Sequence, residues 1–178
     1  MLLTAIGTLD EILRAHASAL GHDFTAYRNH AYRVANLCVA QSAGDPPQIE
    51  KAAIAAAFHD LGIWTHRSFD YLPPSVELAR AHLVRSGRSE WTSAISGMVL
   101  EHHKLRTFRG DPEGLVEPFR RADWVDVTHG LVSFGLPRRL MREVFAAWPD
   151  AGFRMRLLEL ELTRLRTHPL NPLPMLRF

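Results

Sequence analysis

The chain has little cysteine, no long apolar run and almost no excess charge. Its single cysteine, Cys38, excludes a disulfide within the chain and fits a reducing compartment, so we expect a cytoplasmic protein. No segment approaches the roughly 20 consecutive apolar residues of a membrane span. No basic segment precedes an apolar core at the N-terminus, so no signal peptide is expected. A net charge of +2 does not favour a nucleic-acid polymer as partner.

Strand-like alternation is scarce as well, whereas helical periodicity runs through most of the 178 residues. We expect a single all-α domain over residues 1–178, ending in an extended tail (168–178) whose three prolines prevent a helix. The first helix should begin with a capping box formed by Thr8 and Glu11. The expected helices span residues 8–20, 25–41, 46–60, 75–86, 89–103, 118–128, 137–148 and 151–167. Residues 63–74 and 104–117 are expected to be loops.

Adjacent His59 and Asp60 are the most informative pair, because they end an apolar run (52–58) typical of a buried helix. Burying an imidazole and a carboxylate is unfavourable unless they are hydrogen-bonded, paired or bound to a metal. A single His-Asp dipeptide is weak evidence for a functional site, since on average about 0.5 such pairs are expected by chance in this chain. A second one, His22-Asp23, lies in a polar connection where Asp23 or Thr25 can cap the next helix, so we interpret it as structural.

Two further candidate ligands lie on other predicted helices. His30 precedes the His59-Asp60 pair in the chain, and Asp123 follows it. A helical bundle can bring inward-facing side chains from three helices to one point. Imidazole and carboxylate groups suit Mn²⁺, Fe²⁺, Co²⁺, Ni²⁺ or Zn²⁺ better than Ca²⁺, while Mg²⁺ stays open.

This order of residues resembles the HD-domain superfamily of metal-dependent phosphohydrolases. The flanking sequence is similar too: AFHDLG at 57–62, LEHHKL at 100–105 and FRRADWVD at 119–126. The resemblance covers about residues 25–130, and the C-terminal helices and tail (131–178) add nothing to it. It implies an orthogonal helical bundle of the HD type. It also implies that one divalent metal ion is bound by His30, His59, Asp60 and Asp123.

The implied chemistry is hydrolysis of a phosphate ester or anhydride in a small phosphorylated metabolite, with a nucleotide as one candidate. A divalent metal ion lowers the pKa of bound water and polarises a phosphoryl group. Asp60 could then both bind the metal ion and orient the attacking water, so we count it as catalytic. Because phosphoryl transfer depends on positioning and charge neutralisation, nearby Lys or Arg side chains should complete the site.

The segment from Glu101 to Lys104 ends an apolar helix and is the second candidate part of the site. In related HD proteins a residue here contacts the phosphate or protonates the leaving group. The resemblance therefore implies catalytic roles for Glu101, His102 and His103, without a choice between the histidines. Lys104 and Arg106 are candidates for substrate binding. The alternative is a cationic helix end and a solvated basic loop.

Several other residues receive weaker predictions. Asp126, one turn after Asp123, is a candidate for hydrogen bonding to a ligand or a nucleotide sugar, or for pairing with an arginine. Trp64, Phe69 and Tyr71 are candidates for one wall of a substrate pocket. His82 is interpreted as structural, which makes a second metal ion less favoured than a single one.

Two other functions stay open. Some HD proteins are di-iron oxygenases, and here His82 with His102 or His103 could supply the extra ligands. The third function is a non-catalytic, metal-containing module that binds a nucleotide and regulates another process. The apolar C-terminal helix and the proline-rich tail are candidates for a homodimer interface.

Overall fold

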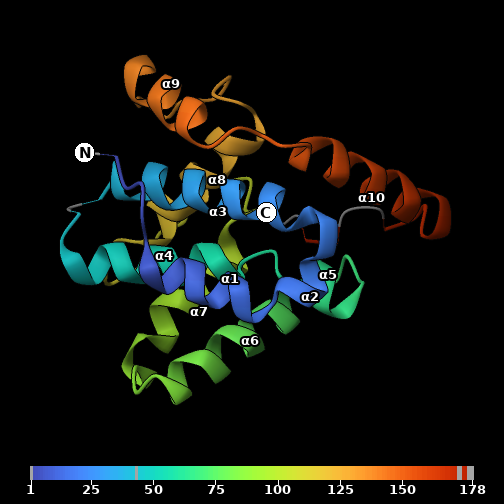
Figure 1. The fold of residues 1–178 in the computed structure, drawn as a ribbon, viewed down its shortest axis with the longest axis horizontal. Coiled ribbons are helices and arrows are strands. Elements are labelled where there is room, and N and C mark those ends of the chain that lie inside the picture. The colour runs from blue at the N-terminus through green and yellow to red at the C-terminus, as the bar shows by residue number, and fades with distance from the viewer. Residues whose placement is uncertain (1, 43, 172–173, 176–178) are drawn as a thin grey trace.

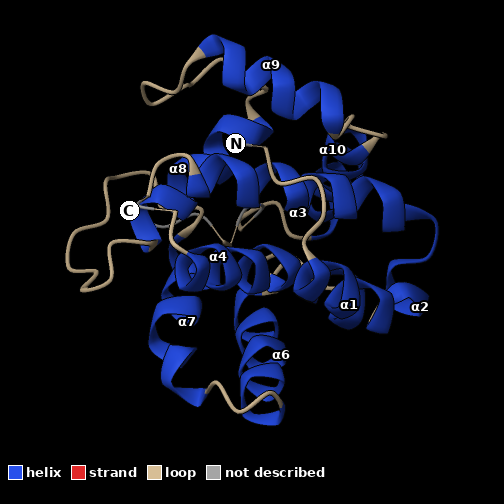
Figure 2. Cartoon of the chain, turned by 60° about the vertical axis from the view of Figure 1, so that its left-hand side comes forward, coloured by secondary structure: helices blue, strands red, loops and turns tan. Residues whose placement is uncertain are grey.

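The computed structural model describes residues 2–42, 44–171 and 174–175. Within these ranges the chain is helical and contains no strand, as the sequence predicts (Figures 1 and 2). None of the helices in these ranges is both long and apolar enough to cross a membrane. The α-helices are α1 (Gly7–Ala15), α2 (Ala17–Leu20), α3 (Phe24–Val39), α4 (Pro46–Phe58), α5 (Gly62–His66), α6 (Leu72–Arg85), α7 (Thr92–Glu101), α8 (Val116–Val127), α9 (Arg138–Ala147) and α10 (Phe153–Thr167), with short 3-10 turns η1 (Gly21–Asp23) and η2 (Ser89–Trp91).

Helix α3 is the central element and packs mainly against α4 and α8. It is buried on nearly every side, including its polar residues His30, Arg33 and Asn36. Buried polar groups must be satisfied by partners within the protein. The polar side chains of α3 therefore require a polar network in the middle of an otherwise apolar core.

Helix α4 is strongly apolar toward its C-terminal end, where residues 52–58 are all buried. Alanine side chains along this run let α1, α3 and α7 approach closely. Its start agrees with the sequence, because the side chain of Asp45 accepts a hydrogen bond from the backbone N–H of Gln48 at 2.9 Å. The C-terminal end of α4 thus delivers His59 and Asp60 into the core beside α3.

Two predictions about the first helix are wrong. The first helix begins at Gly7 without a side-chain cap, and Thr8 donates a hydrogen bond to Glu50 at 3.2 Å instead of forming a capping box. It also ends at Ala15, so residues 8–20 form two helices, α1 and α2. Thr8 thus makes a long-range hydrogen bond to Glu50 instead of the local capping bond.

The expected loop 63–74 contains helix α5 and the first turn of α6. Two prolines occupy the start of α6, and Ser75 lies inside that helix, where its hydroxyl accepts a hydrogen bond from the N–H of Gly62 at 3.0 Å. Gly62 is therefore part of a tight contact between α5 and α6. A Cβ atom at this position would lie 2.5 Å from the backbone oxygen of Tyr71.

The C-terminal part begins with α9, followed by α10 at the edge of the molecule (Figure 1). Phe153, the first residue of α10, is buried in the core. The predicted extended tail lies partly outside the described residues, namely at 172–173 and 176–178. Its described residues form no helix, and Met175 is buried in a small apolar cluster with Phe69 and Tyr71.

Candidate metal centre

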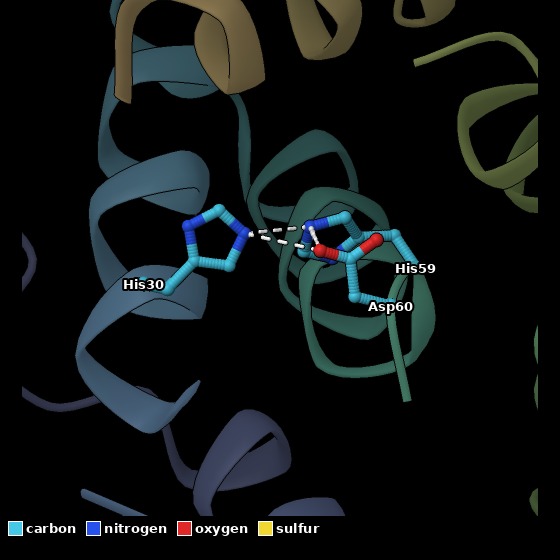
Figure 3. Close-up of side chains that lie close together, drawn as sticks. All are labelled: His30, His59 and Asp60. Atoms are coloured by element: carbon cyan, nitrogen blue, oxygen red, sulfur yellow. Dashed lines mark hydrogen bonds and ion pairs between the residues drawn. The ribbon is translucent and has the colours of Figure 1, made fainter. Parts of the chain in front are cut away.

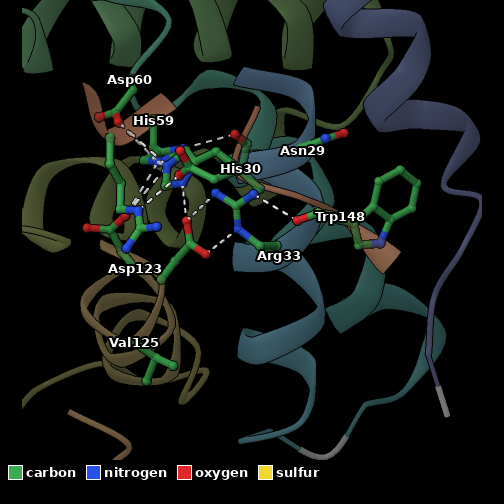
Figure 4. A network of polar contacts seen from close by, with 12 residues as sticks. Asn29, His30, Arg33, His59, Asp60, Asp123, Val125 and Trp148 are labelled. Atoms are coloured by element: carbon green, nitrogen blue, oxygen red, sulfur yellow. Dashed lines mark hydrogen bonds and ion pairs between the residues drawn. The ribbon is translucent and has the colours of Figure 1, made fainter. Parts of the chain in front are cut away.

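Four predicted ligands converge from three helices. His30 lies in α3, and His59 and Asp60 directly follow α4 (Figure 3). Asp123 lies in α8 (Figure 4). Nε2 of His30 lies 2.8 Å from Nε2 of His59 and 3.7 Å from carboxylate oxygens of Asp60 and Asp123. Nε2 of His59 lies 3.5 and 3.8 Å from the same two oxygens. The ligand atoms of His30, His59 and Asp60 all lie within 4.8 Å of one another, so this group can hold a metal ion.

The hydrogen bonds of the two Nδ1 atoms determine whether Nε2 of each imidazole carries a hydrogen or a lone pair. Nδ1 of His30 faces the carboxylate of Asp126 at 2.6 Å, and Nδ1 of His59 faces the carbonyl oxygen of Ala56 at 2.9 Å. Both oxygens accept hydrogen bonds, so each Nδ1 carries a hydrogen and a neutral ring has its lone pair on Nε2. Burial lowers the pKa of His59 to about 3, which keeps that ring neutral. Two lone pairs 2.8 Å apart require a proton or a cation between them.

The buried carboxylates of Asp60 and Asp123 also require a cation nearby. Their side chains are only 5% (Asp60) and 2% (Asp123) exposed. Burial raises the pKa of Asp123 to about 6. Oδ1 of Asp60 and Oδ2 of Asp123 are buried without a hydrogen-bond partner, and an unpaired buried polar atom costs about 1–3 kcal/mol. These two oxygens face Nε2 of His102 and Nδ1 of His103, so a metal ion on that side of the carboxylates would satisfy them.

Both histidines after α7 lie beside this cluster. Nε2 of His102 is 3.3 Å from Oδ1 of Asp60, without hydrogen-bond geometry, and Nδ1 of His103 is 3.8 Å from Oδ2 of Asp123. His102 is fully buried, whereas the side chain of His103 is 18% exposed and its Nε2 lies 2.5 Å from the hydroxyl of Tyr71. Asp60, His102 and His103 thus form a second group that can hold a metal ion.

The pKa values of the two histidines are shifted in opposite directions. Burial opposes the charged form of His102, yet the carboxylates of Asp60 and Asp123 raise its pKa above the ordinary value. Burial lowers the pKa of His103 well below the ordinary value, and the neighbouring His102 adds to that effect. His102 is therefore the better placed of the two to carry a proton.

Asp126 contacts Nδ1 of His30, on the side of the ring away from the other candidate ligands. It is buried and accepts hydrogen bonds from His30 and from Arg33, whose guanidinium contacts both of its oxygens. Burial works against the charged carboxylate, but the bonds from His30 and Arg33 lower the pKa of Asp126. Of the roles predicted for Asp126, the structure places it in contact with a candidate ligand and an arginine.

Two neighbours of His30 were missed in the sequence. Arg33, one turn after His30, links Asp126 to the carbonyl oxygen of Trp148 at 3.0 Å. Phe153 stacks on the imidazole of His30, with ring centroids 4.0 Å apart. The spacing of three residues between His30 and Arg33 could have indicated the first contact. No local signal connects Phe153 with a residue 123 positions earlier.

The predicted phosphate-binding residues lie at the end of α7 and in the segment that follows it. Lys104 lies 3.3 Å from a carboxylate oxygen of Glu101, and Arg106 is exposed. Arg120 donates to both carboxylate oxygens of Glu117 and, at 3.0 Å, to the carbonyl oxygen of Lys104. The segment after α7 is thus fastened to α8 through Arg120.

Two of the three aromatic residues predicted as a pocket wall line a cavity. Trp64 and Phe69 line a cavity of about 730 Å³ between α5 and α10, together with Arg156. Tyr71 contacts His103 instead. Trp64 also packs on Tyr27, whose hydroxyl lies 3.3 Å from the backbone nitrogen of Asp60. None of the four predicted metal ligands lines the cavity.

The other His-Asp pair lies elsewhere. His22 is exposed, while Asp23 accepts hydrogen bonds from Trp64 at 2.8 Å and from Arg156 at 3.0 Å. Asp23 makes no capping bond, so its predicted capping role is wrong although it belongs to no metal-binding group among the described residues. His82 packs against Phe58 and belongs to neither metal-binding group.

Comparison with known protein families, curated proteins and solved structures finds no significant match to the chain. The geometry of the described residues therefore carries the functional interpretation.

Proposed function

We propose that the protein is a divalent-metal-dependent phosphohydrolase of the HD type that acts on a small phosphorylated metabolite. The carrying observation is the pair of Nε2 atoms of His30 and His59, 2.8 Å apart, with both Nδ1 atoms engaged by acceptors. Neutral imidazoles joined by carboxylates form a donor set for Mn²⁺, Fe²⁺, Co²⁺, Ni²⁺ or Zn²⁺, with Mg²⁺ as a further candidate. His30, His59, Asp60 and Asp123 would hold the ion.

The chain's own residues have separate roles in this proposal. A divalent ion would supply water of lowered pKa and neutralise charge on a phosphoryl oxygen. Asp60 would orient that water, and His102, beside Asp60, would carry a proton for the leaving group. His103 is the most exposed member of the cluster and would face the substrate, with Lys104 and Arg106 near the phosphate.

One observation favours a second candidate function. Asp60, His102 and His103 form an additional group of possible metal ligands, and two ions sharing Asp60 would suit an HD-type di-iron oxygenase. Such a protein would contain two iron ions per chain and consume O₂. Measuring the metal content of the purified protein and its O₂ consumption would separate this function from a phosphohydrolase with one ion.

The main test is a screen for phosphate release from a panel of nucleotides, sugar phosphates and simple phosphomonoesters. The purified protein would be stripped of metal and reloaded with Mn²⁺, Co²⁺, Ni²⁺ or Mg²⁺. We expect hydrolysis that depends on the added ion and is abolished by a chelator. Hydrolysis that is indifferent to chelation would contradict the proposal. A loaded protein that releases no phosphate but is stabilised by a nucleotide would indicate a non-catalytic module.

Replacing Asp126 with asparagine should weaken Mn²⁺ binding by about 10–100-fold. The charged acceptor that orients His30 and makes its Nε2 more basic would be lost. The measurement is calorimetric titration of the metal-free protein with Mn²⁺, after circular dichroism has shown that the variant is folded. Asp10→Asn is the matched control, because Asp10 also accepts two hydrogen bonds from an arginine, Arg28, outside the cluster. Equal affinities of the two variants would remove Asp126 from the site.

A further inference from the structure

Helix α10 contacts the rest of the molecule through one face only. Phe153 is buried there, and Leu157 and Leu160 are half-buried against the same core and the cluster around Tyr71. These contacts hold α10 at the edge of the bundle (Figure 1). They also place Phe153 on His30. A surface helix of this kind is expected to be polar on its other face.

The opposite face of α10 is apolar as well. Met155, Leu158, Leu162 and Leu165 are 61%, 47%, 47% and 46% exposed. Their spacing of three, four and three residues is that of the core positions of a coiled coil. At about 100° per residue they form one stripe directed away from Phe153 and Leu157. A helix that is apolar on two faces is normally covered on both.

We propose that a second copy of the chain covers this stripe, with the two α10 helices parallel and in register. Charges beside the stripe argue for this occupant and orientation. In a parallel pair, Arg154 lies across from the partner's Glu159, and Glu161 lies across from the partner's Arg166. By symmetry this arrangement makes four pairs of opposite charge and none of like charge.

The antiparallel arrangement is disfavoured by the same residues. Matching Met155 with the partner's Leu165 would centre the pair on Leu160. Glu159 would then lie near the partner's Glu159, and Glu161 near the partner's Glu161. Like charges at these flanking positions discriminate against a pairing mode. The charges beside the exposed stripe of α10 therefore favour a second copy of the chain in the parallel orientation.

The expected dimer is weak and does not depend on the proposed enzymatic function. The stripe covers only two heptads, too few for a stable isolated coiled coil, but α10 is already held as a helix by its inner face. In the chain alone, Arg154 pairs with Asp150 and Glu159 with Arg156 on the exposed surface. Such exposed pairs are weak, so exchanging them for pairs across the dimer costs little.

Sedimentation equilibrium of the full chain between about 1 and 300 µM tests the association, since small interfaces give weak complexes. We expect a reversible monomer–dimer equilibrium in this range. Leu158→Lys should weaken it by at least about 100-fold, because a charge replaces a core position. Leu131→Lys is the matched control, since Leu131 is 91% exposed and lies outside α10. A wild-type chain that stays monomeric, including one that instead binds phospholipid vesicles, overturns the proposal.

Two charge variants test the flanking pairs. Glu159→Arg with Glu161→Arg makes all flanks positive, and Arg154→Glu with Arg166→Glu makes them all negative. Each double variant should dimerise at least about 10-fold more weakly than the wild type, and mixing the two should restore a heterodimer. Retained self-association of each variant, without preference for the mixed pair, contradicts the assigned contacts.

Orientation is tested by disulfide formation under mild oxidation. Met155→Cys should cross-link with itself in a parallel pair, and the buried Cys38 does not compete. A cross-link that forms only between Met155→Cys and Leu165→Cys chains would show antiparallel pairing and overturn the orientation proposed.

Discussion

Replacing Asp60 with alanine is expected to weaken divalent-metal binding and to lower phosphate release by at least about 100-fold each. Asp60 belongs to both groups of candidate ligands, with one carboxylate oxygen toward His30 and His59 and the other toward His102. Removing it leaves only Asp123 to balance the charge of an ion. The measurements are calorimetric titration with Mn²⁺ and phosphate release from the best substrate of the screen.

The chain supplies a matched control for this variant in Asp23. It also follows a histidine, is buried and accepts two hydrogen bonds, but from Trp64 and Arg156. Asp23→Ala should lower the free energy of unfolding by about 1–3 kcal/mol while metal binding and hydrolysis stay unchanged. Activity that survives Asp60→Ala, in a variant shown to be folded, would contradict the phosphohydrolase proposal.

Replacing Gly62 with alanine is expected to lower the free energy of unfolding by about 2–3 kcal/mol, or the Tm by about 4–12 °C. The new Cβ would lie 2.5 Å from the backbone oxygen of Tyr71 and 2.9 Å from the hydroxyl oxygen of Ser75. The start of α6 would have to move away, weakening the hydrogen bond between Gly62 and Ser75. Because Tyr71 contacts His103, the displacement should also reach the metal centre.

Gly7→Ala is the comparison for this substitution, with thermal unfolding followed by circular dichroism. Gly7 is also helical, and a Cβ atom added there would have nothing within 4 Å of it. This variant should be stabilised by about 0.4–1 kcal/mol, since alanine restricts the unfolded chain and favours helix. If the two variants unfold at the same temperature, the α5–α6 contact is not tight.

Most residues of the candidate site could be predicted from the sequence. His59 and Asp60 could be selected because an apolar run indicated their burial, and His30 and Asp123 because their order matched a family pattern. The choice between His102 and His103 could not be made, because adjacent residues after a helix can turn either way. In the structure both lie beside the carboxylates, at different depths.

The sequence by itself determined the helical class and the burial of α4, because both follow from periodicity and composition within short segments. It did not determine that Thr8 bonds to Glu50 instead of capping the first helix, since Glu50 belongs to a distant helix. Only the tertiary structure decided that Asp126 bonds to His30 and that Phe153 stacks on it. These partners are 96 and 123 positions apart, and only the packing of α3 against α8 and α10 brings them together.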